Sequence, residues 1–282
     1  MKVLLCLAFI VCLSYRAQAQ CPDNCSCENL MAECTGINYI PLVNAFPNDT
    51  QAFIFKDCNL QNLPKISYPQ ATTLQIINSS VTAFEEEPFS DMPILKNLEI
   101  SDNPLDSLDD NTFRGLDNLE RLVVTRSSLN AVSKKLFETL LALRELDLSY
   151  NPYLKFDKTE LSSLSLERLD LVGCELSDAQ LVSKDSELSV QHLELSMNKI
   201  ETLESNTFAS IKNLQKLVLS SNLIIDVETG AFAGLAQLQD IHLEFNNLTQ
   251  LPDDIFDPTP ALTNVDLSNN AFTVLEVNKP VL

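Results

Sequence analysis

An eleven-residue pattern recurs along the chain from residue 50 onward, and it constrains the fold more than any other feature. The pattern L-x-x-L-x-L-x-x-N-x-L is clearest in five copies, which begin at Leu95, Leu143, Leu214, Leu238 and Leu262. Weaker copies begin at Thr50, Ala71, Leu119, Leu166 and Val190, so that successive copies start 21 to 24 residues apart. Such a period indicates a solenoid, in which each repeat packs against its neighbours.

Each copy predicts one short strand. Leucines that alternate with variable residues bury one face, and consecutive strands then lie parallel, about 4.8 Å apart. The ninth pattern position holds an asparagine in six copies, whose amide can bond backbone groups where the chain leaves the strand. These are Asn103, Asn151, Asn198, Asn222, Asn246 and Asn270, and the same position holds Cys58, Ser79, Ser127 and Cys174 in other copies.

Cys58 and Cys174 are five repeats apart, which places them about 24 Å from each other at the strand spacing. We therefore expect two buried structural thiols and no disulfide between them. A phenylalanine follows eighteen residues after the start of most copies, and this constant phase predicts a stacked core behind the sheet. Its members are Phe89, Phe113, Phe137, Phe208, Phe232 and Phe256. The chain beyond residue 50 is thus predicted to form one curved domain of ten repeats.

The first 19 residues have the organisation of a secretory signal peptide. Lys2 precedes an apolar run over residues 3–13, and Ala17 and Ala19 form an A-x-A site with cleavage after Ala19. The run is shorter than the roughly 20 residues that a membrane-spanning helix needs. No later segment is apolar enough to span a bilayer, so we expect a secreted, extracellular protein.

Four cysteines, Cys21, Cys25, Cys27 and Cys34, crowd at the start of the predicted mature chain. In an oxidising compartment such a cluster is a disulfide framework, and four cysteines leave three pairings open. Four N-x-S/T sequons are candidate glycosylation sites, which fits passage through the secretory pathway. They are at Asn24, Asn48, Asn78 and Asn247.

The cysteine cluster CPDNCSCENLMAEC and the ten copies together resemble the extracellular leucine-rich repeat (LRR) proteins with a cysteine-rich N-terminal cap. This resemblance implies an α/β solenoid shaped as a horseshoe, with a parallel sheet on its concave face and repeats of about 24 residues. It implies a cap over residues 20–49, a solenoid over residues 50–282, and disulfides Cys21–Cys27 and Cys25–Cys34. The family's usual cysteine-containing C-terminal cap is missing, because no cysteine follows Cys174.

Charge narrows the range of partners. The sequence has 39 acidic and 19 basic residues, a net charge of -20, which disfavours nucleic acid and anionic membranes as ligands. With 5 glycines and 2 histidines, the chain has little material for phosphate-binding loops or histidine metal sites. No catalytic, nucleotide-binding or calcium-loop motif occurs. We therefore expect no enzymatic activity, no cofactor and no metal.

Two columns of side chains are expected to face outward on the concave side. The third pattern position alternates in charge through Arg121, Glu145 and Arg168, which is either a self-paired ladder or a binding surface. The fifth position contains five acids and no lysine or arginine: Glu99, Asp147, Asp170, Glu194 and Asp266. This column either steers a basic ligand or is simply a solvated acidic face.

Apolar residues near the strand exits are candidate anchors for a ligand. Tyr150, Val172, Met197 and Phe245 occur there on neighbouring repeats, where packing does not require them. The two histidines, His192 and His242, face the same side two strands apart, about 10 Å, which is too far for a shared metal. We expect His242 to join Tyr150, Met197 and Phe245 in contacting the ligand.

Three functions are compatible with these observations. The first is a secreted, non-enzymatic protein that binds a protein or glycan ligand in immunity, adhesion or matrix organisation, and the acidic column favours a ligand with a basic surface. The second is a matrix or assembly component that dimerises through its uncapped C-terminal repeats. The third is a non-catalytic partner or inhibitor of a secreted enzyme. The sequence does not identify the ligand, because recognition lies in variable positions.

Overall fold

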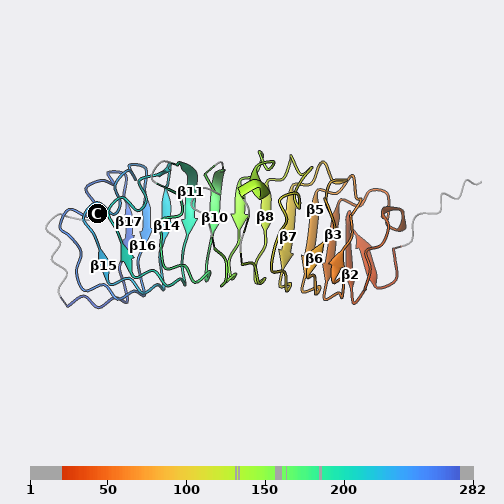
Figure 1. Ribbon diagram of the computed structural model, residues 1–282, viewed down its shortest axis with the longest axis horizontal. Helices are drawn as coiled ribbons and strands as arrows, with labels where there is room; N and C mark the ends of the chain where they lie inside the picture. Colours follow the sequence, from red (N-terminus) through yellow and green to blue (C-terminus); the bar gives the residue numbers. More distant parts are fainter. Residues whose placement is uncertain are drawn as a thin grey trace, which may run out of the picture.

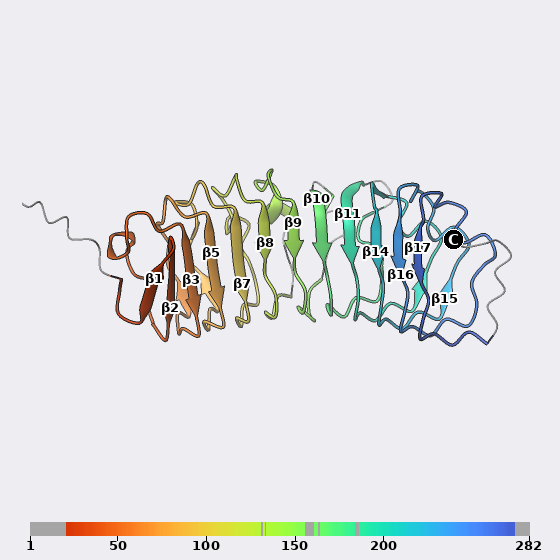
Figure 2. The same ribbon diagram turned by 180° about the vertical axis from the view of Figure 1, so that it is seen from behind.

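The described chain is one elongated row of strands. The computed structural model describes residues 21–130, 132, 134–155, 161–162, 164–183 and 186–273. The predicted signal peptide over residues 1–19 lies outside these residues. Figures 1 and 2 show the strands side by side, from the N-terminal hairpin at one end to the last repeat at the other.

A thirteen-stranded sheet runs the length of the molecule. At its start β1 (Cys25–Glu28) and β2 (Met31–Thr35) form an antiparallel hairpin, and β2 pairs in parallel with the first repeat strand. The ten repeat strands follow in chain order as β3 (Ala52–Lys56), β5 (Thr73–Ile77), β7 (Asn97–Ser101), β8 (Arg121–Val123), β9 (Glu145–Asp147), β10 (Ser165–Asp170), β11 (Leu188–Glu194), β14 (Lys216–Val218), β16 (Asp240–His242) and β17 (Asn264–Asp266). The short strand β13 (Ile211–Lys212) also pairs with β11.

The chain returns from each strand to the next mostly through turns. Two small parallel sheets lie outside the main sheet, one formed by β4 (Asn62–Leu63) and β6 (Ala83–Phe84), the other by β12 (Thr202–Leu203) and β15 (Asp226–Val227). In the described residues the helical structure is two 3-10 helices, η1 (Val43–Ala45) and η2 (Lys134–Phe137). The predicted LRR solenoid with a parallel sheet is confirmed, and its described residues contain very little helix.

The strand register confirms which side chains share a face. The third pattern positions are paired from each strand to the next, from Ala52 on β3 to Asn264 on β17. Leucines at the fourth position, such as Leu98 and Leu193, are at most 1% exposed and point into the core. Side chains alternate along a strand, so the third and fifth positions face outward.

The asparagine ladder forms along the edge where the strands end. Asn198 is typical: its Nδ2 donates to the carbonyls of Leu171 and Leu195 at 2.8 and 2.9 Å. Its Oδ1 accepts the backbone N–H groups of Cys174 and Leu176, each at 3.0 Å. One buried amide therefore satisfies four backbone groups in two repeats.

Cys58 and Cys174 replace the ladder asparagine as predicted. Both are free and buried, and the Cys174 Sγ donates to the carbonyl of Leu148 at 3.3 Å. Burial raises the pKa of the Cys174 thiol to about 11, so it stays protonated at neutral pH and is a poor nucleophile.

The phenylalanine core is confirmed where its rings stack. Phe208 and Phe232 are stacked with ring centroids 6.3 Å apart, and Phe232 and Phe256 at 5.9 Å. The column changes in the fifth repeat, where Leu161 occupies the phenylalanine position.

The N-terminal end is closed by the disulfide-bonded hairpin. Cys21 is bonded to Cys27 and Cys25 to Cys34, the pairs that the family resemblance implies. The second bond joins β1 to β2 across register partners. The hairpin thereby covers the first repeat strand and protects the end of the apolar core.

Candidate functional site

The concave face is hollowed over the middle of the sheet, from β8 to β11. The hollow has a volume of about 390 Å³. It is lined by Thr125, Arg126, Asp147, Ser149, Tyr150, Arg168, Asp170, Val172, Glu194 and Ser196. We call it the central hollow. Three of the five predicted acids, Asp147, Asp170 and Glu194, therefore meet in one place, together with Tyr150 and Val172.

Two of these carboxylates are held by their own strand exits. Asp147 Oδ1 accepts the backbone N–H of Ser149 at 2.9 Å, and Glu194 Oε1 accepts that of Ser196 at 3.1 Å. Each acid thus caps the N–H two residues further along the chain. These bonds fix the carboxylates at the wall of the hollow.

Asp170 does not make the corresponding bond. The backbone N–H of Val172 donates to the Ser149 hydroxyl at 3.1 Å instead. The Oδ2 of Asp170 accepts from Arg168 Nε at 2.6 Å, while its Oδ1 is buried without a hydrogen-bond partner. Burial raises the pKa of Asp170, and the charges of Asp147 and Glu194 add to this rise, whereas Arg168 opposes it. The central hollow therefore has an acceptor that its own structure leaves unsatisfied.

A line of bulky side chains borders the central hollow where the strands end. The residue just before the ladder position has a positive φ in all ten repeats, for example 54° at Asp57 and 54° at Asn269. Asparagine, aspartate and glycine tolerate this left-handed conformation, whereas large side chains are disfavoured there. In the middle and C-terminal repeats the position nevertheless holds Arg126, Tyr150 and Met197, and later Phe245, with φ between 47° and 60°.

Three of these residues form a continuous ridge across four repeats. The Arg126 guanidinium lies 4.9 Å from the centroid of the Tyr150 ring, a cation–π contact. The Tyr150 hydroxyl lies 3.9 Å from Met197 Sδ. The intervening repeat supplies Gly173, and a Cβ added there would lie 3.0 Å from the tyrosine ring. Gly173 thus leaves room for Tyr150 to extend over its neighbour. We call Arg126, Tyr150 and Met197 the ridge.

The remaining predicted site residues lie elsewhere on the sheet. Glu99 on β7 already accepts from Gln75 at 2.8 Å and from Ser101 at 2.9 Å. Val123 and Val218, both largely buried, interrupt the fifth-position column on either side of the central hollow. The predicted acidic column is therefore a cluster of three acids with Glu99 and Asp266 apart from it.

The third-position column is partly self-paired. Arg121 Nε lies 3.0 Å from Glu145 Oε2 across adjacent strands, as the ladder interpretation expects. Arg168 turns toward Asp170 on its own strand and so supplies a cation inside the central hollow. Burial, with the charges of Arg168 and Lys216, lowers the pKa of His192, which favours its neutral form.

His242, Phe245 and Asp266 lie at the C-terminal end of the concave face. His242 and Asp266 are register partners on β16 and β17, and Glu244 lies two residues after His242. The Phe245 side chain is 57% exposed at the strand exit. These residues are separated from the central hollow by β14, so the nine predicted ligand contacts form more than one group.

The four sequon asparagines are all exposed. Asn24 lies in the turn just before β1 and is exposed there, although cysteines surround it in the sequence. Asn78 donates to Asp57 at 2.7 Å at the strand-exit edge, and Asn48 and Asn247 lie in surface turns. Their glycosylation stays a prediction.

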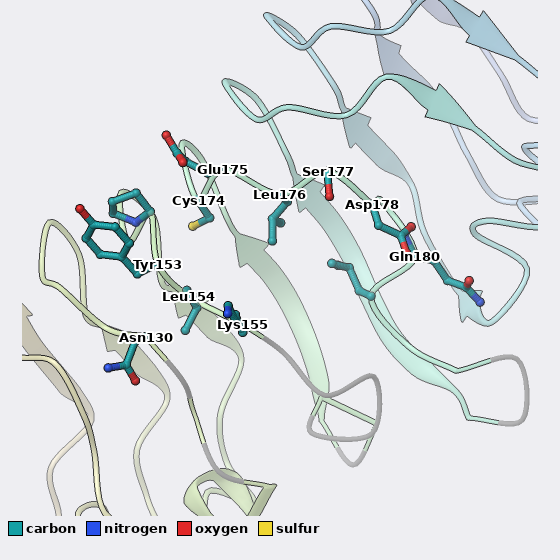
Figure 3. A pocket seen from close by; sticks show the side chains of 12 residues that line it. Asn130, Tyr153, Leu154, Lys155, Cys174, Glu175, Leu176, Ser177, Asp178 and Gln180 are labelled. Atoms are coloured by element: carbon teal, nitrogen blue, oxygen red, sulfur yellow. The ribbon is translucent and has the colours of Figure 1, made fainter.

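A second hollow, of about 950 Å³, lies beyond the ladder at the strand exits of the fifth and sixth repeats. Figure 3 shows it between the segment with Tyr153, Leu154 and Lys155 and the segment from Cys174 to Gln180. Its lining mixes apolar and charged side chains without a convergent set of polar groups. The buried Cys174 thiol at its wall is the protonated ladder cysteine described above.

Arg126 and Glu244 are the residues that sequence reasoning missed. Arg126 occupies the eighth repeat position and Glu244 the seventh. Reading those columns across all ten repeats would have placed Arg126 beside Tyr150, and Glu244 among the hydroxyl residues that otherwise dominate the seventh position.

One family model, described as "Leucine rich repeat", matches residues 69–126, 117–176 and 189–248, which together make up more than half of the chain. The chain belongs to the leucine-rich repeat family. Proteins of this family are generally non-catalytic binding scaffolds. Among the described residues of this LRR protein, no helix combines the length and the apolarity needed to cross a bilayer.

A curated relative is Leucine-rich repeat-containing protein 3 of Danio rerio, which is 25% identical over 184 residues. The match covers 62% of this LRR protein and 60% of the relative, so the chain spans less than two thirds of that relative's length.

Solved LRR structures share the fold. TLR13 in its complex with ssRNA13 superposes with a TM-score of 0.71 at 24% identity, over 83% of this chain and 33% of TLR13. The Drosophila Toll–Spatzle complex gives 0.65 at 20% identity, over 84% and 37%. Human 5T4 gives 0.57 at 19% identity, over 81% and 82%.

Proposed function

We propose that this LRR protein is a secreted, non-catalytic binding protein that recognises an extracellular protein by receiving its basic side chains in the central hollow. The observation that carries the proposal is Asp170. Three carboxylates line the hollow with two guanidinium groups, of which Arg168 pairs with Asp170 while Arg126 lies over the Tyr150 ring. The Oδ1 of Asp170 is left without a donor. A lysine or arginine of a ligand supplies the missing charge and the missing donor.

The ridge supplies the apolar part of the same surface. Tyr150 and Met197 are 38% and 55% exposed, and they keep a backbone conformation that their side chains disfavour. Strained backbone of this kind is concentrated at binding sites, and aromatic residues beside charged ones are typical of interface hot spots. The ridge therefore supports an interface whose partner is a folded protein or peptide.

The similar structures support a macromolecular ligand and leave its identity open. Toll is captured with Spatzle, and TLR13 with an RNA. The negative charge of the central hollow and of the whole chain argues against a nucleic acid here. Three carboxylates also favour a cationic protein over a neutral glycan. Secretion is supported by the predicted signal peptide and by the disulfide-bonded hairpin. Roles in immunity, adhesion or matrix organisation, as an inhibitor of a secreted enzyme, and in C-terminal dimerisation stay predictions.

A charge-matched pair of triple variants tests the proposal. The first, Asp147→Asn with Asp170→Asn and Glu194→Gln, neutralises the central hollow. The second neutralises Glu85, Glu86 and Asp109, which are exposed acids away from the concave sheet. The probe is a fluorescein-labelled peptide rich in lysine and arginine, and the readout is fluorescence anisotropy at low and high salt.

We expect the first variant to weaken binding by about tenfold or more and the second by less than about threefold. Equal losses would mean that only the net charge attracts the peptide, and the proposal would then be wrong. Circular dichroism of both variants controls for folding.

A further inference from the structure

A second cluster of polar side chains lies at the C-terminal end of the concave face, outside the central hollow. It consists of His242, Glu244 and Asp266. His242 ends β16, Glu244 follows two residues later on the same face, and Asp266 is the cross-strand partner of His242 on β17. Residues two apart on one strand face the same side, and cross-strand partners are adjacent, so the three side chains form a compact triangle on the sheet.

The triangle has the dimensions of a metal-binding set. One donor atom from each residue lies within 4.8 Å of the other two. His242 Nδ1 is 3.6 Å from Glu244 Oε2. Donors bound to one tetrahedral zinc at the usual bond lengths are roughly 3.4 Å apart, so small side-chain rotations bring all three into range.

A separate observation points into the triangle. Glu244 Oε2 is one of the three buried side-chain atoms in the described residues that lack a hydrogen-bond partner. The other oxygen of this carboxylate, Oε1, accepts from Ser220 Oγ at 2.6 Å, which fixes the group. Asp266 is likewise fixed, since its Oδ1 accepts the backbone N–H of Ser268 at 2.9 Å. Glu244 is therefore anchored through one oxygen and has the second available, and Asp266 is held beside it by Ser268.

We infer that His242, Glu244 and Asp266 bind one zinc ion. A neutral imidazole nitrogen and two carboxylate oxygens are ligands that Zn²⁺ accepts, whereas Ca²⁺ and Mg²⁺ require mainly oxygen. The buried, partnerless oxygen of Glu244 gains a cation, and the negative charge of Asp266 is neutralised. Three protein ligands leave a fourth position open to the concave surface, where a water or a donor group of a bound protein completes the tetrahedron.

The competing explanation is a plain ion pair between protonated His242 and Glu244. In that state the histidine nitrogen carries a proton and cannot bind metal. The two explanations predict opposite results when metal is added at neutral pH, so they can be separated without knowledge of the protein ligand.

The experiment titrates ZnCl₂ into the EDTA-stripped mature chain by isothermal titration calorimetry at neutral pH. CaCl₂ and MgCl₂ serve as parallel probes. The variants are His242→Ala and Asp266→Asn. The matched control is His192→Ala, which removes a half-buried histidine from the same face two strands away. The buried thiols of Cys58 and Cys174 are inaccessible to the added metal.

We expect one Zn²⁺ per chain, a higher melting temperature with zinc, and no comparable effect of Ca²⁺ or Mg²⁺. His242→Ala and Asp266→Asn should each weaken binding by about tenfold or more, and His192→Ala should leave it unchanged. Circular dichroism establishes that each variant is folded. Absence of saturable zinc binding, or equal losses in His242→Ala and His192→Ala, would overturn the inference.

Discussion

The asparagine ladder and the concave face are built from adjacent positions of the same repeats. The buried polar groups of the ladder are hydrogen-bonded, whereas two on the concave face are not. In the ladder, Asn198 bonds to backbone carbonyl and N–H groups of two repeats through its amide nitrogen and oxygen. Asn222 and Asn246 likewise donate to the carbonyls of two repeats, and each accepts one backbone N–H. On the concave face, Asp170 and Glu244 each bury an oxygen without a hydrogen-bond donor. These are two of the three such side-chain atoms in the part of the chain that the structure describes.

The difference separates two uses of buried polarity. A satisfied amide holds the repeats together, because removing it would leave backbone groups unpaired. A buried carboxylate oxygen without a donor lowers the stability of the fold. Such a group is expected where a ligand supplies the missing donor.

The largest effect is expected in the ladder. Asn198→Ala removes the partner of the Leu171 carbonyl and of two backbone N–H groups, whereas the Leu195 carbonyl still accepts from Asn222. We therefore expect a loss of about 3 kcal/mol in the free energy of unfolding. Urea denaturation measures it. The control is Asn118→Ala, whose exposed amide donates to the Pro93 carbonyl at 2.8 Å and should cost less than about 1 kcal/mol. Similar losses in both variants would contradict the role of the ladder.

The contribution of Asp170 to the free energy of unfolding should decrease as the pH rises, whereas that of an acid with a lowered pKa increases. Its pKa is raised in the folded protein, so the unfolded chain loses this proton first and stability falls as pH rises above the ordinary value of an aspartate. The free energy of unfolding of Asp170→Asn, minus that of the unmodified protein, should therefore be more favourable to the variant at pH 7 than at pH 3. Urea unfolding at the two pH values provides the measurement.

Asp266 gives the control of opposite sign. Hydrogen bonds from the Ser268 N–H and side chain lower the pKa of Asp266, so its contribution is present at neutral pH and is lost as pH falls through the lowered value. Asp266→Asn should accordingly lose stability at pH 7 in the absence of metal. If both variants changed in the same direction, the assignment of Asp170 as an acid whose burial outweighs its ion pair with Arg168 would be wrong.

A substitution in the ridge should raise the stability of the fold and lower the affinity for the ligand. Tyr150→Asn places a residue that tolerates positive φ at this position, so we expect a gain of up to about 1 kcal/mol in stability, less the lost contacts with Arg126 and Met197. Affinity for the basic peptide should fall. Asp102→Asn, at the same repeat position with φ 55°, should change neither quantity. A destabilised Tyr150→Asn that binds normally would show that the ridge is structural.

The smallest effect is expected for the exposed ion pair of the third-position column. Arg121 and Glu145 are each about half exposed, at 45% and 46% of their side-chain surface. Arg121→Gln should therefore cost less than about 0.5 kcal/mol, and the difference should vanish at high salt. A larger, salt-independent cost in thermal denaturation would mean that this ladder is part of the framework.

The periodicity alone predicted most of the fold. The leucine alternation determined the strand faces, and the spacing of 21 to 24 residues determined the register from Ala52 to Asn264. Cys58 and Cys174 could be assigned to the ladder because they occupy the asparagine position. These features depend on one-dimensional repetition, which a sequence displays directly.

The site was only partly predictable, because its properties depend on hydrogen bonds between repeats. The sequence placed Asp147, Asp170 and Glu194 in one column but treated them as equivalent. Ser149 makes them different, since its hydroxyl takes the N–H that Asp170 would otherwise cap. The ridge likewise depends on Gly173, whose missing side chain gives Tyr150 its place.

The most direct test of the central claim compares Asp170→Asn with Glu99→Gln in binding to the same basic peptide. Both substitutions remove one negative charge from the same column, but Glu99 already accepts hydrogen bonds from Gln75 and Ser101. We predict that the dissociation constant rises by about tenfold for Asp170→Asn and by less than about twofold for Glu99→Gln. Equal increases would contradict the claim that the central hollow is a built acceptor site.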